Sequence, residues 1–123
     1  MDDGRGLSPE DIFAGFPEGV AICRAVQDAV SRLGGASVTA TKSQIAFRRR
    51  RVFAYLWRPG QYISSDVPAV LSIALPRRTE SARFKEVAHP SATVWMHHLE
   101  LHTPDELDAQ VLGWLADAYA NAG

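Results

Sequence analysis

Apolar residues recur at helical spacing near both ends of the chain and alternate with polar residues in between. Within residues 17–33 an apolar stripe repeats at steps of three and four, through Val20, Cys23, Val26, Val30 and Leu33. A second stripe follows residue 106, through Leu107, Val111, Trp114, Leu115, Ala118 and Tyr119. These stripes predict two amphipathic helices that flank a region of β-structure.

The middle of the chain contains short runs rich in β-branched and aromatic residues, which predict strands. The runs cover residues 38–47, 52–57, 70–75, 84–87 and 93–102. We expect turns between them at Arg49-Arg50, at Arg58-Pro59-Gly60 and at His89-Pro90-Ser91, where charged residues, proline or glycine interrupt the pattern.

Two motifs led by a hydroxyl residue predict helix starts. Ser8-Pro9-Glu10-Asp11 combines a capping residue, a proline and an acid three positions after the cap, which predicts a short first helix. Thr103-Pro104-Asp105-Glu106 is a capping box, so the C-terminal helix is expected to begin there. Gly34-Gly35 is expected to end the helix of residues 17–33, because glycine readily takes the left-handed conformation beyond a helix end.

The predicted fold class is α+β. It is an antiparallel β-sheet of about four to five strands, with two N-terminal helices and one C-terminal helix packed mainly on one face. A length of 123 residues fits one domain. We place that domain at residues 8–123, after a flexible N-terminal tail of residues 1–7.

A two-residue turn at Arg49-Arg50 would divide the side chains of the first hairpin between two faces. The core face would hold Ser43, Ile45, Phe47, Val52, Ala54 and Leu56. The opposite, aromatic–basic face would hold Lys42, Gln44, Arg48, Phe53, Tyr55 and Trp57. Rings supply flat stacking area and cations attract anions, so this face is a candidate ligand surface.

Charge is distributed unevenly, although the net charge is −1. Residues 42–85 contain ten basic and two acidic residues, whereas residues 86–123 contain six acidic residues and no Lys or Arg. This distribution offers an alternative to a ligand surface. The arginines would pair with the acidic ends of the chain, and the rings would pack beneath a loop or a second layer. Burial of the aromatic face in a homodimer is a further alternative.

The run of residues 93–102 places its histidines on both faces of the sheet, because neighbours on a strand point to opposite sides. His97 shares a face with Trp95 and leucines, so we interpret it as a hydrogen-bonded core histidine. His98 and Glu100 share the other face. Together with His102 they have metal-ligand types, but residues two apart on a strand lie about 7 Å apart and no fourth ligand is evident, so we predict no metal site.

Several classes of protein lack support in the sequence. It contains no G-x-S-x-G motif, glycine-rich phosphate loop or cysteine pair, so we predict neither catalytic residues nor a cofactor. The single cysteine, Cys23, lies on an apolar stripe and fits a buried residue in a reducing cytoplasm. The acidic N-terminus does not resemble a signal peptide, and no run approaches the roughly 20 apolar residues of a membrane span.

Three segments carry a resemblance to a known family: TKSQIAF, ALPRR and WMHHLEL. Over about residues 17–120 the chain resembles a bacterial group catalogued as domain of unknown function 5655. The resemblance implies an α+β domain of this size. Related domains can follow nuclease-like or transport-annotated regions in longer proteins, which implies an accessory module. The resemblance implies no catalytic residues.

We therefore expect a cytoplasmic binding or accessory domain that is not an enzyme and recognises an anionic or polar small molecule or a peptide. The candidate site residues are Lys42, Gln44, Arg48, Tyr55, Trp57, His98 and Glu100. One alternative is an accessory module that binds single-stranded nucleic acid. Another is a small enzyme in which His98 and Glu100 form an acid–base pair. The protein is expected to be a monomer or homodimer, without a membrane partner.

Overall fold

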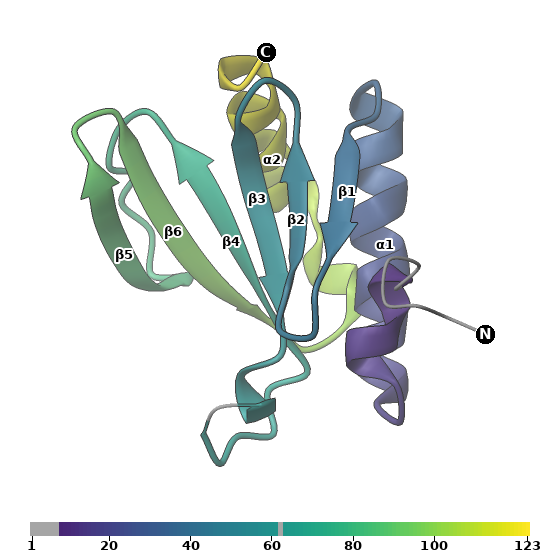
Figure 1. The fold of residues 1–123 in the computed structure, drawn as a ribbon. Helices are drawn as coiled ribbons and strands as arrows, with labels where there is room; N and C mark the ends of the chain where they lie inside the picture. The colour runs from purple at the N-terminus through teal and green to yellow at the C-terminus, as the bar shows by residue number, and fades with distance from the viewer. Residues whose placement is uncertain (1–7, 62) are drawn as a thin grey trace.

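The fold is a single antiparallel sheet with helices on one face (Figure 1). The computed structural model describes residues 8–61 and 63–123, so the predicted tail of residues 1–7 lies outside the described residues. Six strands follow the order β1-β2-β3-β4-β6-β5. They are β1 (Ser37–Ala40), β2 (Ile45–Arg48), β3 (Val52–Trp57), β4 (Ala69–Leu75), β5 (Phe84–Ser91) and β6 (Val94–Leu101).

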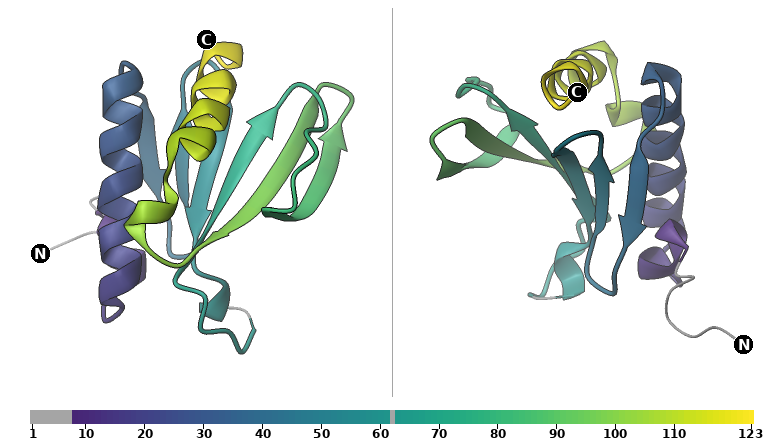
Figure 2. Two further views of the ribbon diagram at one scale, coloured as in Figure 1. Left: turned by 180° about the vertical axis from the view of Figure 1, so that it is seen from behind. Right: turned by 45° about the horizontal axis from the view of Figure 1, so that its top comes forward.

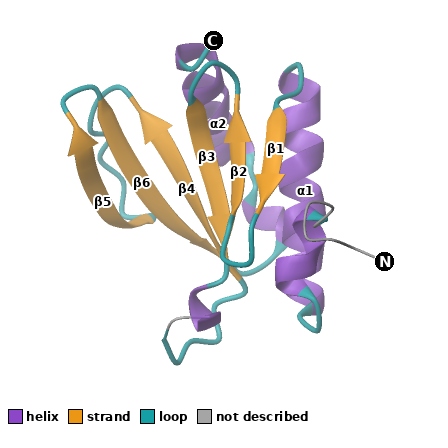
Figure 3. Ribbon diagram, viewed as in Figure 1, coloured by secondary structure: helices purple, strands orange, loops and turns teal. Residues whose placement is uncertain are grey.

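Two α-helices, α1 (Pro17–Leu33) and α2 (Ala109–Asn121), lie behind the sheet as Figure 1 shows it. The reverse view shows α2 in front of the central strands and α1 beside β1 (Figure 2). Three short 3-10 segments complete the fold, namely η1 (Pro9–Phe13), η2 (Pro59–Gln61) and η3 (Pro104–Glu106) (Figure 3). Among the described residues, no helix covers the other face of the sheet. The α+β prediction is confirmed, while the number of strands and the extent of the helices need correction.

The strand predicted at residues 38–47 is in fact two strands, which raises the number of strands to six. A tight turn interrupts it, where the Thr41 backbone N–H donates to the Gln44 carbonyl. The Thr41 hydroxyl oxygen also accepts hydrogen bonds from the backbone N–H groups of Ser43 and Gln44. Side-chain hydrogen bonds of this kind offer the backbone an alternative to the strand, so no glycine or proline is needed.

The predicted register of the β2–β3 hairpin is wrong. A bulge between Phe47 and Arg48 pairs Arg48 with Val52 instead of Arg51. Phe53 lies at this irregularity. The predicted register had placed it on the aromatic–basic face. It is instead fully buried, with its ring centroid 6.5 Å from that of Phe47 and 5.3 Å from that of Tyr119 on α2. The extra residue of a bulge bends the strand and redirects a side chain, here into the core.

The sequence correctly predicted the start of the first short helix and both ends of α1. Ser8 and Asp11 form the predicted capping box, although the helix they start is the five-residue 3-10 segment η1. Helix α1 has the predicted bounds, and Gly34 follows it at φ +131°. That angle lies in the region that favours glycine.

The predicted start of the last helix is wrong, because the Thr103 motif forms only η3. Helix α2 begins at Ala109, after Asp108 accepts a hydrogen bond from the Val111 backbone N–H.

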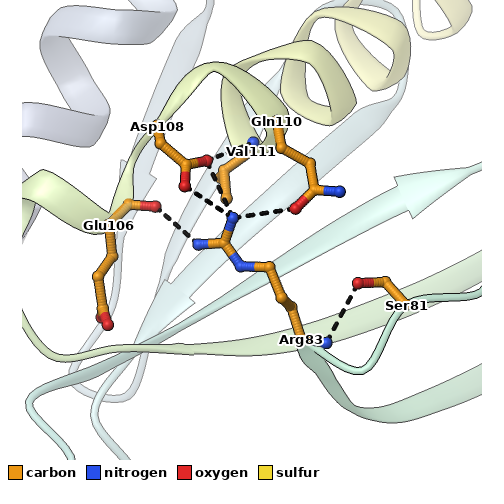
Figure 4. A network of polar contacts seen from close by, with 6 residues as sticks. All are labelled: Ser81, Arg83, Glu106, Asp108, Gln110 and Val111. Atoms are coloured by element: carbon orange, nitrogen blue, oxygen red, sulfur yellow. Dashed lines mark hydrogen bonds and ion pairs between the residues drawn. The ribbon is translucent and has the colours of Figure 1, made fainter.

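Arg83 fixes the start of α2 to the start of β5 (Figure 4). One guanidinium nitrogen of Arg83 lies 2.9 Å from both carboxylate oxygens of Asp108, and another donates to the Glu106 carbonyl at 3.0 Å. This contact lowers the pKa of the Asp108 carboxyl below its ordinary value.

The predicted turn at His89-Pro90-Ser91 is also wrong, because β5 continues through these residues.

The covered face of the sheet forms the core with both helices. Its strand residues include Ile45, Phe47, Leu56, Leu71, Ile73, Leu99 and Leu101. Cys23 on α1 is fully buried in this core, as predicted, and burial raises the pKa of its thiol to about 11. The core therefore accounts for the apolar half of the alternating pattern and leaves the other half on the uncovered face.

Candidate functional site

The uncovered face of the sheet carries a hollow with a volume of about 400 Å³, which we call the open-face hollow. Its lining comes from β3, β4, β6 and the residue before β2. The lining residues are Gln44, Tyr55, Trp57, Ser72, Met96 and His98. Four of them were candidate site residues in the sequence analysis: Gln44, Tyr55, Trp57 and His98. The volume lies in the range typical of small-molecule sites.

Strand pairing explains why these side chains meet. Tyr55 on β3 lies opposite Ser72 on β4, and Ser72 lies opposite His98 on β6. Opposite residues of antiparallel strands point to the same face, so the three form one row across the sheet. Trp57 is two residues further along β3, and its ring leans diagonally toward Ser72.

Hydrogen bonds through Ser72 hold two of the rings. The indole nitrogen of Trp57 donates to the Ser72 hydroxyl oxygen at 2.9 Å, and that oxygen lies 2.6 Å from Nδ1 of His98. An indole N–H can only donate, so the Ser72 oxygen accepts from it and its own O–H can donate to a neutral His98. The two rings also meet edge to face, with centroids 6.3 Å apart.

Burial sets the protonation of His98. Removal from water disfavours the imidazolium, and this lowers the pKa of His98 below 6.5. Glu86, the partner of His98 on β5, opposes that shift but is the smaller cause. His98 is therefore neutral at pH 7, which is the form that accepts the Ser72 hydroxyl hydrogen at Nδ1.

Several polar groups of the hollow have no hydrogen-bond partner among residues 8–61 and 63–123. Among the described residues, the structure records no hydrogen bond to the side-chain amide of Gln44, the hydroxyl of Tyr55 or Nε2 of His98. These groups supply both donors and acceptors. Together with the half-buried rings they give the hollow the chemical means to bind a polar, flat molecule.

Three predicted site residues lie outside the hollow. Lys42 is exposed in the turn before β2, and Arg48 is exposed at the far end of that strand. Glu100 lies on the same face as His98 but opposite Val70, and its carboxylate is 3.6 Å from Nε2 of His102. The structure thus separates the cations and the carboxylate from the rings that they were expected to join.

Ser72 and Met96 are lining residues that the site prediction missed. Ser72 is only 1% exposed and lies in a run of buried residues, so it resembles an incidental serine in an apolar strand. The alternation of β4 could have found it, because Ser72 points away from Leu71 and Ile73. Met96 could have been found in the same way, as it shares a face with His98.

His97 is a structural residue, as the sequence analysis predicted. It is 0% exposed on the covered face. Its Nδ1 lies 2.9 Å from the Trp95 carbonyl, and its Nε2 accepts from the Thr79 backbone N–H at 2.9 Å. Burial lowers the pKa of His97 as well. Both ring nitrogens are engaged, so this histidine attaches the β4–β5 connection to β6.

The described residues contain no group of three or more His, Cys, Asp or Glu side chains that could hold a metal ion. The row of His98, Glu100 and His102 is therefore no such group. No helix in the described part of the chain is long and apolar enough to cross a membrane.

Fold and site together define a small α+β domain whose sheet has one helix-covered face and one uncovered face with a hollow. The chain belongs to the family described as domain of unknown function DUF5655, whose model matches residues 10–122. The match confirms the resemblance and extends it at both ends. No curated protein and no solved structure matches the chain.

Proposed function

We propose that this protein is a binding domain that recognises a small, polar, uncharged molecule with a flat ring in the open-face hollow. The observation that carries the proposal is the arrangement of Trp57, Ser72 and His98, in which two hydrogen bonds through one hydroxyl fix two rings. A site whose side chains are already held in place loses little entropy when a ligand binds.

The lining favours a flat, uncharged ligand over an anion. Tyr55 and Trp57 provide ring surface, and Met96 provides an adaptable thioether. No lining residue carries a full charge at pH 7, because His98 is neutral and the cations Lys42 and Arg48 lie elsewhere. Gln44 offers an amide that can pair with a donor and an acceptor on the edge of a heterocycle.

The same geometry favours binding over catalysis. Ser72 is almost fully buried and accepts a hydrogen bond from Trp57, so its hydroxyl is poorly placed to attack a substrate. The acid–base alternative needs Glu100 beside His98, but the contact that the structure records for Glu100 is with His102.

We also propose a cytoplasmic location, because the lone cysteine is a buried, unpaired thiol.

A binding measurement with defined probes tests the proposal. We expect nicotinamide, adenine or uracil to bind the protein in ligand-observed NMR. Tyr55→Ala should weaken the best probe about tenfold, since ring stacking contributes roughly 1–3 kcal/mol. Gln44→Ala should weaken it two- to tenfold, in line with about 0.5–1.5 kcal/mol for a hydrogen bond.

Leu112→Ala is the matched control, because Leu112 is an exposed apolar residue on α2, away from the hollow. It should leave the affinity unchanged. If none of the three probes binds at millimolar concentration, or if Leu112→Ala weakens binding as much as Tyr55→Ala does, the proposed function is wrong.

A further inference from the structure

We propose that the end of the sheet at the β2–β3 turn is a second binding surface, which takes the phosphate backbone of a nucleic acid. We call it the arginine end; its basic members are Arg48, Arg49, Arg50, Arg51, Arg77 and Arg78. The proposal does not rest on the open-face hollow or on the function proposed for it.

Strand pairing brings the two arginine segments together. Strands β3 and β4 pair antiparallel with Ala54 opposite Ile73, so the turn before β3 lies beside the residues that follow β4. Both segments also reach the C-terminal end of α2, because the backbone N–H groups of Arg50 and Arg51 donate to the Ala122 carbonyl and Arg77 lines a hollow with Asn121. Arg50 lines a hollow of about 270 Å³ with Gly123, and Arg77 lines one of about 350 Å³ with Asn121.

The four consecutive arginines divide into two kinds. The side chains of Arg49 and Arg51 donate to the carbonyls of Tyr119 and Asn121, respectively, at the last turn of α2. The guanidinium of Arg49 also lies 4.2 Å from the ring centroid of Tyr119. Cations near the negative end of a helix stabilise it, and carbonyls there lack helical partners. These two arginines are therefore structural.

The remaining arginines are available to a partner. Arg48, Arg50 and Arg77 are exposed, and the structure records no hydrogen bond or ion pair from their side chains to other described residues. Arg78 is exposed and pairs with Glu80 at 2.9 Å. A second carboxylate near these groups, Asp117, lines the hollow of Arg77. The acidic side chains recorded beside these six arginines are thus Glu80 and Asp117, so basic side chains are in clear excess at this end.

The composition of the surface indicates phosphate as the partner chemistry. Its cations are all arginine, whose planar guanidinium pairs with phosphate oxygens in a bidentate manner. The turn and the β4–β5 connection extend over the ends of β2, β3 and β4, which is about 10 Å at the usual strand spacing. Along the axis of a duplex each strand carries one phosphate per roughly 3.4 Å, so this width corresponds to about three phosphates of one strand.

An acidic protein is a poorer match. Tight protein interfaces centre on apolar or aromatic anchors. The exposed large apolar residues of the described chain are Phe16, Val38, Ile63 and Leu112, and none of them belongs to residues 48–51 or 76–80.

Fluorescence anisotropy tests this surface with a 12-nucleotide oligothymidylate and a 12-base-pair duplex as probes. We expect binding to at least one probe at 50 mM NaCl, with a marked loss at 200 mM because counterions are released. The double variant Arg50→Ala, Arg77→Ala should bind at least tenfold more weakly. Its plot of log affinity against log salt should be flatter by about 0.7 for each lost contact on the single strand.

Lys42→Ala is the control, because Lys42 is an exposed cation at the opposite end of β2. It should change affinity less than twofold. The double variant Arg50→Lys, Arg77→Lys should recover part of the affinity, since it restores charge without the bidentate geometry. The proposal fails if neither probe binds, if binding is indifferent to salt, or if Lys42→Ala weakens it as much as the arginine variant. Equal affinity for a heparin fragment of matched charge would overturn it too.

Discussion

His97 and His98 are neighbours in the sequence, yet they serve opposite faces of the sheet. His97 is fully buried on the covered face, where the protein itself engages both ring nitrogens. His98 is half-buried on the uncovered face, and among the described residues its ring has a hydrogen-bond partner at Nδ1 alone. One side chain completes the core, while the other leaves Nε2 on the face where we propose that a ligand binds. Alternation along a single strand is enough to separate these roles.

The comparison extends to the rings of β3. Phe53 is redirected into the core by the bulge, whereas Tyr55 stays on the uncovered face and lines the hollow. If the two faces differ as described, a substitution on one should mainly reduce stability and a substitution on the other mainly reduce binding.

The largest expected effect is on stability at Phe53. Phe53→Ala should lower the free energy of unfolding by roughly 3–5 kcal/mol, because it leaves a cavity between Phe47 and Tyr119. Tyr55→Ala, its counterpart on the uncovered face, should lower it by about 1 kcal/mol or less. Urea unfolding followed by circular dichroism measures both. Equal losses would show that Tyr55 also belongs to the core.

The histidine pair should give the next largest difference. His97→Ala removes the partners of the Thr79 N–H and the Trp95 carbonyl inside the core, and should reduce stability by roughly 2–4 kcal/mol. His98→Ala removes one bond to Ser72 and should reduce stability by about 1 kcal/mol. The same unfolding assay decides, and a larger loss for His98 would contradict the assignment of the two faces.

A smaller effect is expected from pH. Burial lowers the pKa of both histidines in the folded state, so below pH 6.5 the unfolded chain binds protons more readily than the folded protein. Stability should therefore be greatest above about pH 7 and should fall as the pH decreases through 6.5 toward 5. Asp108 stays ionised in this window, because Arg83 lowers its pKa. The free energy of unfolding should depend less on pH in His97→Ala than in the unsubstituted protein. If neither His97→Ala nor His98→Ala changes the pH dependence, the two histidines are not its cause.

The regular parts of the fold could be predicted from the sequence because their signals are local. Helix α1 and strand β3 have the predicted bounds, since a long apolar period and an uninterrupted β-rich run specify them. The predicted start of α2 was wrong because the capping residue is Asp108, whose carboxylate accepts from Arg83, a residue 25 positions away. The roles of Arg49 and Arg51 likewise depend on a helix end 70 residues along the chain.

The residues of the candidate site could be predicted in part. Gln44, Tyr55, Trp57 and His98 were found from alternation and residue type, and the structure brings them together. Phe53 was assigned to the wrong face because no residue in the turn predicts the bulge. Lys42 was misplaced because the hydroxyl of Thr41 ends β1 through its own hydrogen bonds. Ser72 was missed because its role is to link Trp57 and His98 by hydrogen bonds, and these residues lie on two strands that are distant in sequence.

The most direct test of the open-face hollow uses the three tryptophans as internal probes. Trp57 lines the hollow, whereas the ring of Trp95 stacks on His89 and that of Trp114 packs against Phe84. Indole N–H signals can be followed by two-dimensional ¹H–¹⁵N NMR as nicotinamide is added, and assigned by single Trp→Phe variants. We predict that the Trp57 signal shifts in a saturable manner while the other two stay in place. A Trp57 signal that does not move while another indole shifts would contradict the central claim.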